Sequence, residues 1–173
     1  MWYTTPNLLK GTDPLSRLLL ALIFVAGAAQ AQDSTINFGG FQQNSGQPIE
    51  VVSDQLDVDQ QDGSAIFTGD VTATQGDLVL TGERVEVFYT TGENRRISRL
   101  YATGGVTLVT STEAAEADEA TYEVVEGSIA MQGNVLVTQG DSAIAGDRMT
   151  VDMETGTGRV EGRVRTIFQT DEN

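Results

Sequence analysis

A segment of 34 residues occurs twice in this chain, and this duplication constrains the fold more than any other feature of the sequence. Residues 54–87 align without a gap to residues 118–151, and 12 of the 34 positions are identical. Because a frame of conserved spacing with a shared apolar rhythm is typical of a repeated supersecondary unit, we expect the core to be built by stacking copies of one unit. Four of the identities are glycines, namely Gly63 and Gly127, Gly69 and Gly133, Gly76 and Gly140, and Gly82 and Gly146.

Apolar residues recur at every second position from residue 48 onward. Leu56 and Val58 alternate with acidic residues, and the two copies agree on their apolar positions, as at Phe67 and Met131. Alternation over about four to eight residues, interrupted by Gly, Asp and Asn, is typical of half-buried β-strands and does not fit a helical period. At roughly 8 to 12 residues per strand and turn, residues 48–168 are expected to form about ten to sixteen short strands, which suits a jelly roll or a sandwich.

A shorter pattern, x-x-G-x-V, occurs four times along the chain. Its glycines are Gly69, Gly104, Gly133 and Gly162, at intervals of 35, 29 and 29 residues. A glycine inside a strand marks a bend, a bulge or a close approach of another backbone. We therefore predict antiparallel strands that bend at equivalent places and stack into a folded-over sheet with one apolar inside.

The first 31 residues have the three-part pattern of a secretory signal peptide. Lys10 and Arg17 supply a positive region, and residues 18–29 are an apolar run too short for a usual membrane span. Ala29-Gln30-Ala31 is a small-residue cleavage site, so we expect export with cleavage near Ala31/Gln32. The alternative interpretations are an uncleaved anchor and a short buried helix.

Two polar segments flank the predicted domain. Residues 32–47 contain glycines and little apolar periodicity, so we predict a flexible leader. Phe38 and Phe41 are the leader residues that can dock elsewhere. Residues 169–173 are expected to form a short acidic tail.

The composition excludes several classes of function. Of ten basic residues, Lys10 and Arg17 precede residue 32, which leaves eight arginines against 24 acids and a net charge of −16. Such acidity argues against a nucleic-acid partner and against nonspecific binding to an anionic membrane surface. The chain has no Cys and no His, which excludes thiol nucleophiles, Ser-His triads and most zinc sites. We predict no catalytic residue, no metal site and no cofactor.

Acidic residues gather at residues 54–62 and 113–119, and arginines gather at residues 95–99 and 159–165. Calcium takes about six to eight oxygen ligands, but no EF-hand loop fits, so we favour a solvated acidic face over a calcium site. The arginines can bind phosphates or carboxylates as bidentate donors, or they can form salt bridges with neighbouring acids.

Several short motifs follow the signal peptide in a fixed order. Before and within the first copy they are Gln47-Pro48-Ile49, Ser53-Asp54, Thr68-Gly69-Asp70-Val71 and Thr74-Gln75-Gly76. At the start of and within the second copy they are Ala117-Asp118, Tyr122, Gly133-Asn134-Val135 and Gly146-Asp147. In this order the motifs resemble the OstA/LptA family of periplasmic lipopolysaccharide-transport proteins over residues 48–168. The chain departs from that family in having no lysine after residue 31.

The resemblance implies an OstA-like β-jelly roll whose antiparallel strands are bent into a V-shaped stack with an apolar slot. The slot would hold the lipid A acyl chains of lipopolysaccharide. The residues expected to contact lipid are Ile49, Val51, Leu56, Val58, Phe67, Val71, Leu80, Leu108, Tyr122, Met131, Val135 and Val137.

The resemblance also implies how the protein would act in the periplasm. Protomers would associate head to tail and bridge an inner-membrane-anchored jelly-roll partner to an outer-membrane barrel translocon. The bridge would pass lipopolysaccharide to the outer membrane without catalysing a reaction. The alternatives are a related jelly-roll component of the same pathway and a structural β-solenoid without a lipid ligand.

Overall fold

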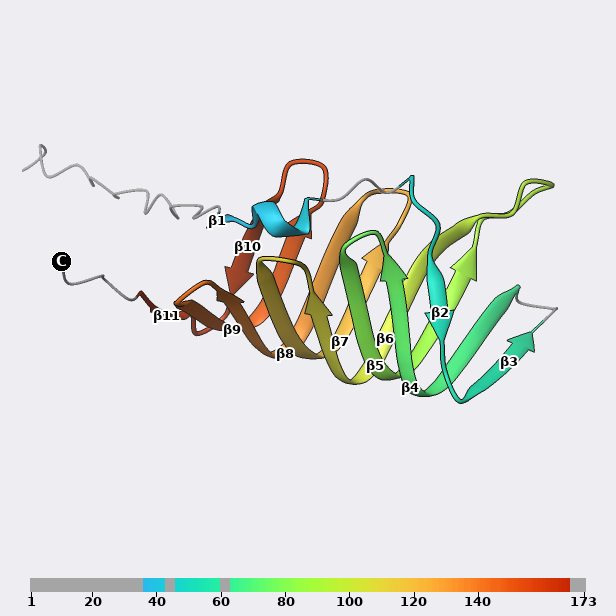
Figure 1. Ribbon diagram of the computed structural model, residues 1–173, viewed down its shortest axis with the longest axis horizontal. Helices are drawn as coiled ribbons and strands as arrows, with labels where there is room; N and C mark the ends of the chain where they lie inside the picture. Colours follow the sequence, from blue (N-terminus) through green and yellow to red (C-terminus); the bar gives the residue numbers. More distant parts are fainter. Residues whose placement is uncertain (1–35, 43–45, 60–62, 169–173) are drawn as a thin grey trace, which may run out of the picture. The chain divides into compact units, whose positions relative to one another are not determined.

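The alternating segments form one antiparallel sheet of 11 strands, in which strands consecutive in the chain are neighbours over most of the sheet (Figure 1). The computed structural model describes residues 36–42, 46–59 and 63–168, which all lie in the unit Ser34–Asn173. The predicted signal peptide, its cleavage site and the predicted acidic tail lie outside these ranges. Within them, no helix is long and apolar enough to cross a membrane.

Six long strands make up the centre of the sheet, and short strands complete it at both ends. The long strands are β4 (Ser64–Gln75), β5 (Leu78–Tyr89), β6 (Ile97–Val109), β7 (Glu113–Glu123), β8 (Ser128–Gln139) and β9 (Ser142–Asp152). The short strands are β1 (Ile36–Asn37), β2 (Glu50–Val52), β3 (Gln55–Asp59), β10 (Thr157–Glu161) and β11 (Arg165–Ile167), and a 3-10 turn, η2 (Gly39–Phe41), follows β1. The sheet order is β1-β10-β9-β8-β7-β6-β5-β4-β2, with β3 also on β4 and β11 also on β9. This arrangement confirms the predicted all-β, antiparallel fold.

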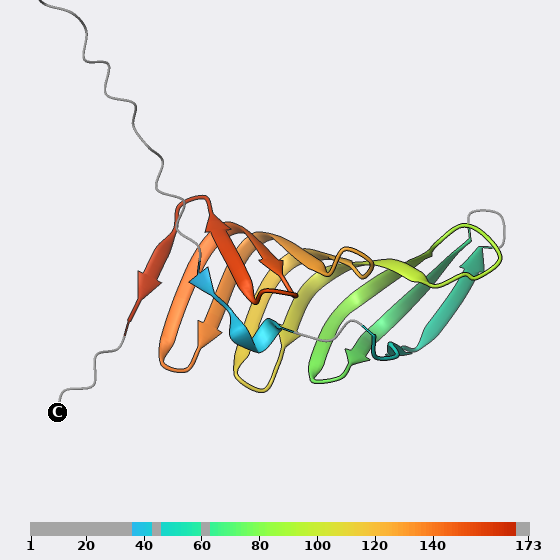
Figure 2. The ribbon, with the colours of Figure 1, turned by 90° about the horizontal axis from the view of Figure 1, so that it is seen from above.

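Each long strand bends near its middle, where the pairing register shifts. The pairing of β4 with β5 shifts between Thr68 and Val71, and that of β8 with β9 shifts between Gln132 and Val135. At each end of the sheet, two short strands stand in place of one long bent strand. There β2 and β3 pair with the two halves of β4, and β10 and β11 pair with the two halves of β9. The sheet therefore folds over on itself, and one of its faces becomes an interior (Figure 2).

The four glycines of the x-x-G-x-V pattern lie at these bends, each with a positive φ between 79° and 96°. At each of them, an acidic side chain from the preceding strand or corner lies where a Cβ atom would be. A larger residue would collide with that side chain, so glycine is required at these corners both for φ and for space. The pairs are Gly69 with Asp54, Gly104 with Glu83, Gly133 with Asp118, and Gly162 with Asp147.

Equivalent positions of the two sequence copies point to the same interior, but their burial depends on their place in the sheet. Val71 and Val135 are both 1% exposed. Met131 is fully buried, whereas Phe67 is half-buried against the same core. The difference arises because β8 lies between two long strands, while β4 has only the short strands β2 and β3 beyond it.

The structure departs from the expected flexible leader at residues 36–42. Ile36 and Asn37 form β1 and pair with Gly158 and Thr157 of β10. Phe38 and Phe41 are fully buried and belong to the main apolar core. The segment is ordered by these two aromatic side chains, because burying a Phe side chain contributes about 1.5–3 kcal/mol relative to leaving it exposed.

Replacing Gly133 by Ala tests the corner geometry. We expect Gly133→Ala to lower the free energy of unfolding by at least about 1 kcal/mol more than the matched change Gly140→Ala. Both glycines have a positive φ, but a Cβ at Gly140 meets open space, whereas a Cβ at Gly133 meets the Asp118 carboxylate. Urea unfolding of the two variants measures the difference, and equal costs would contradict a role for the close contact.

Candidate functional site

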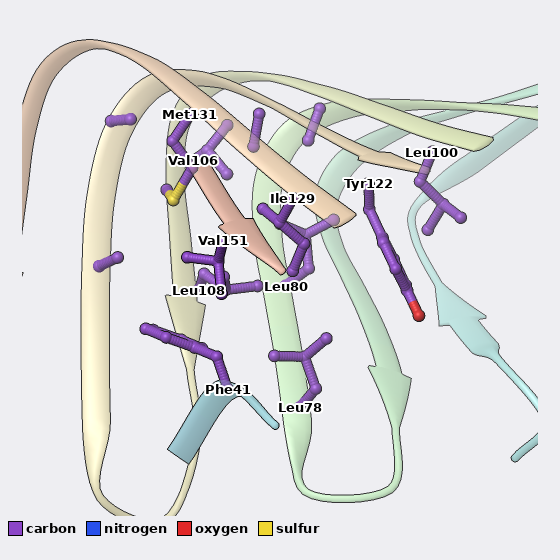
Figure 3. Packing of buried hydrophobic residues seen from close by; sticks show 14 of the residues in the cluster. Phe41, Leu78, Leu80, Leu100, Val106, Leu108, Tyr122, Ile129, Met131 and Val151 are labelled. Carbon is purple, nitrogen blue, oxygen red and sulfur yellow. The ribbon is translucent and has the colours of Figure 1, made fainter. Parts of the chain in front are cut away.

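The inside of the folded sheet, which we call the slot, contains most of the residues predicted from the sequence to bind a ligand. Figure 3 shows Leu80, Leu108 and Tyr122 reaching this interior from different strands. The buried members of the predicted set are Val71, Leu80, Leu108, Tyr122, Met131, Val135 and Val137. Ile49, Val51 and Phe67 are half-buried and pack against the same core.

Leu56 and Val58 do not share that environment. Their side chains are 54% and 63% exposed on β3, which lies at the end of the sheet. With Phe67, Tyr89 and Arg95 they line an open hollow of about 560 Å³ at the end of the sheet. Alternation places them on the inward side of their strand, but no strand beyond β3 covers them in the described chain.

The deepest part of the slot is almost filled by side chains. Its open volume is about 10 Å³, which is about the space that one water molecule needs. The surrounding side chains are apolar except for Thr74, Gln75 and the Tyr122 hydroxyl. The lining residues are Ile49, Ala73, Thr74, Gln75, Leu78, Leu80, Leu100, Leu108, Ala120, Tyr122 and Ile129. An apolar ligand can enter this space only if the walls move apart.

A wider cleft of about 720 Å³, which we call the mouth, opens beside this interior. Ile49 and Gln75 line both spaces, so the mouth adjoins the slot. Its remaining lining comes from residues 46–48, from the start of β6 at Arg96 and Ile97, and from Val124 and Val125 after β7. The mouth therefore combines apolar walls with one positively charged side chain.

A chain of hydrogen bonds joins the wall of the slot to the mouth. The Tyr122 hydroxyl donates to Oε1 of Gln75 over 2.7 Å, and Nε2 of Gln75 donates to the backbone oxygen of Gln47 over 2.9 Å. Burial raises the pKa of the Tyr122 phenol above its ordinary value of 10.0, because the low-dielectric interior disfavours the phenolate. The phenol is therefore neutral at physiological pH and acts as a hydrogen-bond donor in a wall that is largely apolar.

The arginines of residues 95–99 lie near aromatic rings. The guanidinium of Arg99 lies 4.0 Å from the centre of the Phe88 ring, and that of Arg95 lies 5.4 Å from the centre of the Tyr89 ring. Arg95 also donates a hydrogen bond of 3.1 Å to the backbone oxygen of Gly63. Both side chains therefore pack on aromatic faces at this end of the sheet, and their binding to phosphates or carboxylates stays a prediction. In the parts of the chain that the structure describes, no three acidic side chains come together in a way that would hold a metal ion.

Sequence reasoning missed Glu113, which it placed in a solvated acidic stretch. The Glu113 side chain is only 4% exposed, and its carboxylate accepts hydrogen bonds from the Phe41 amide over 3.1 Å and from Nε2 of Gln139. One signal was present in the sequence: Glu113 is in phase with the inward-facing Ala115 and Ala117. The period of two therefore pointed to an inward carboxylate before its partners were known.

Comparison with known proteins agrees with this geometry. A family model described as LptA/(LptD N-terminal domain) LPS transport protein matches residues 50–157. An uncharacterized protein of Rhizobium meliloti (strain 1021) is 29% identical over 156 residues, which is 84% of each chain. The lipopolysaccharide export system protein LptA of Escherichia coli K12 is 29% identical over 109 residues, covering 60% of this chain and 59% of LptA.

A solved structure shares the fold. LptH of Pseudomonas aeruginosa is described as the LptA homologous periplasmic component of a lipopolysaccharide transport device. It superimposes with a TM-score of 0.63 at 20% sequence identity, covering 72% of this chain and 96% of LptH. At that identity the similarity establishes the jelly-roll architecture.

The buried phenol makes stability depend on pH at the alkaline end. The pKa of Tyr122 is raised in the folded state, so its neutral phenol adds to the free energy of unfolding. This stabilisation is complete below about pH 10, the ordinary pKa, and is lost as the pH rises through the folded-state pKa. Tyr122→Phe removes that dependence and, at neutral pH, should cost about 1 kcal/mol through the lost hydrogen bond to Gln75. Urea unfolding between neutral pH and pH 11 measures both effects, with Tyr89→Phe, which alters a half-buried tyrosine at the end of the sheet, as the control. An alkaline decline that is the same with and without the Tyr122 hydroxyl would contradict the assignment.

Proposed function

The chain belongs to the family of lipopolysaccharide transport proteins that includes LptA and the N-terminal domain of LptD, and from this membership we propose that it carries lipopolysaccharide across the periplasm. In this proposal the slot accepts the acyl chains of lipid A. The protein serves as a bridge component that passes the lipid toward the outer membrane. It does so by binding alone, with no reaction catalysed.

The observation that carries the proposal is the position of the mouth directly beside an apolar slot. Each buried CH₂ group contributes about 0.8 kcal/mol, so a lipid with long acyl chains needs only an apolar channel to bind tightly. Ile49 and Gln75 line both spaces and mark the route between them. Arg96 lies at the rim of the mouth, where its guanidinium suits a phosphorylated headgroup while the acyl chains point inward.

The two ends of the sheet support the proposed partners. At one end β2 and β3 expose Val52, Leu56 and Val58. At the other end β11 exposes Ile167 and is flanked by the exposed residues Val164 and Phe168. Apolar edge strands of this kind invite pairing with a strand of another chain. We propose that these edges mediate head-to-tail self-association. They would also dock the inner-membrane-anchored jelly-roll partner and the outer-membrane barrel translocon.

Photo-crosslinking at two neighbouring residues, one facing the interior and one facing outward, tests lipid binding. A photoreactive residue at Ile49 should crosslink to lipopolysaccharide in cells, because this side chain lines both the mouth and the slot. The same residue at the exposed Glu50 should give no lipid adduct and serves as the matched control. Mass spectrometry of the purified periplasmic protein should also detect lipopolysaccharide. A lipid-free preparation that fails to bind lipopolysaccharide in vitro would contradict the proposal and favour the structural β-solenoid.

Charge substitutions at the two ends test head-to-tail association. Sedimentation velocity at rising concentration should show larger species for the unmodified protein and at least about tenfold weaker association for Val58→Glu or Ile167→Glu, because either change places a charge in one half of the interface. Leu136→Glu, on the outer face of the central strand β8, is the control and should associate normally.

A mixture of the two end variants distinguishes the type of interface. In a head-to-tail contact each variant keeps one intact end, so Val58→Glu and Ile167→Glu together should form dimers that do not grow further. Dimers that form within either variant alone would indicate a symmetric contact instead. A strictly monomeric unmodified protein would contradict edge-to-edge assembly.

A further inference from the structure

Residues 36–42, which we call the strap, are attached to the body of the sheet by a set of specific hydrogen bonds. The Phe38 amide donates to the oxygen of Gly156 over 2.7 Å, and the Phe41 amide donates to the buried Glu113 carboxylate over 3.1 Å. Nε2 of Gln42 donates to the oxygen of Glu154 over 2.8 Å. The strap therefore joins β7 to the turn between β9 and β10, on the C-terminal half of the slot (Figure 2).

The strap also fills the interior that it covers. Phe38 and Phe41 are both 0% exposed, and their rings make an edge-to-face contact with centres 6.1 Å apart. A Cβ atom at Gly158 would collide with the Phe38 ring, so the glycine in β10 is what allows that ring to lie against the sheet. Figure 3 shows Phe41 in the same interior as Leu78, Leu108 and Val151. Two aromatic rings thus occupy space that is continuous with the wall of the slot.

We propose that the C-terminal half of the slot is an acyl-chain site, which the strap occupies until a lipid displaces Phe38 and Phe41. The inference rests on the function proposed above. It adds that two phenylalanines of the protein itself compete with the acyl chains for one part of the slot. Phe38 and Phe41 are fully buried members of the core, so an acyl chain entering this half must take over the volume that their rings now fill. The free energy gained by burying an apolar group is roughly proportional to the area it removes from water. An acyl chain that takes the place of the two rings therefore replaces one buried apolar surface by another, which makes the displacement feasible.

The position of the strap in the chain suits this role. The family model matches residues 50–157, so the strap lies before the segment that the family shares. The long strands pair with one another from β4 to β9, so the sheet does not need the strap for its own ladder. The chain runs from the strap to residues 46–49, which line the mouth. A lipid that enters the mouth would therefore touch residues 46–49, which follow closely after the strap in the chain.

A disulfide between Asn37 and Thr157 tests the proposal without altering either phenylalanine. The two residues are paired in the β1–β10 ladder, and the bond from the Phe38 amide to the Gly156 oxygen flanks them. That bond identifies a non-hydrogen-bonded pair, whose Cα atoms lie about 4.5 Å apart and suit a disulfide. The chain has no native cysteine, so Asn37→Cys/Thr157→Cys can form one intramolecular disulfide.

Binding of fluorescently labelled lipopolysaccharide to the double variant is measured before and after reduction. We expect the oxidised protein to bind at least about tenfold more weakly than the same protein reduced, because locking the strap removes the binding-competent state. The single variants Asn37→Cys and Thr157→Cys, treated with the same oxidant, should bind like the unmodified protein. Equal binding by the oxidised and reduced double variant would overturn the strap proposal while leaving the proposed function intact. Failure of the unmodified protein to bind lipopolysaccharide would overturn both.

Amide hydrogen exchange follows the displacement directly in the unmodified protein. Saturation with lipopolysaccharide should accelerate exchange of the Phe38 and Phe41 amides, whose acceptors are Gly156 and Glu113. The Asp54 amide, bonded to the oxygen of Gly69 at the corner between β2 and β3, is far from the strap along the sheet order; it is the control and should stay protected. Lipid-loaded protein in which the Phe38 and Phe41 amides remain protected would overturn the proposal.

Discussion

The structure depends on the close contact between a glycine and an acidic side chain at the corners of the sheet. At Gly69 and Gly133 the side chains of Asp54 and Asp118 take the space of a missing Cβ, and the positive φ turns the strand through the bend. Without these corners the sheet would extend flat and leave its apolar face in water. With them, one face closes on itself and supplies the core, and the acids that crowd the corners account for part of the strong negative charge.

The chemistry of the enclosed face supports the proposal that it holds an apolar ligand. Among its described residues the polar groups are few, and Tyr122 and Gln75 satisfy each other through a hydrogen bond. Burial keeps the Tyr122 phenol neutral by raising its pKa, so this part of the wall carries no charge, and the buried Glu113 carboxylate lies apart from it under the N-terminal segment, bonded to Phe41 and Gln139. The positive charge lies outside, at Arg96 in the mouth. In the proposed function, the apolar wall would hold the acyl chains of the lipid and the positive charge would face its anionic headgroup.

Much of the fold could be predicted because its determinants are local. A period of two residues defines a strand and its inward face, and a glycine within a strand marks a bend, whatever the remainder of the chain does. The predicted inward positions from Val71 to Val137 are buried for this reason. Leu56 and Val58 follow the same rule but are exposed, because burial also needs a neighbour and β3 is the last strand at its end of the sheet.

By itself, the sequence determined the strands, the side of each strand that faces inward, the corners between them and the family to which the chain belongs. Only the tertiary structure decided which segment closes the slot and which groups bond the inward-facing carboxylate of Glu113. Phe41 and Glu113 lie 72 residues apart, and the pairing of Ile36 with Gly158 spans most of the domain. No periodicity records such contacts, because they exist only once the folded sheet has brought its last strands beside its first residues.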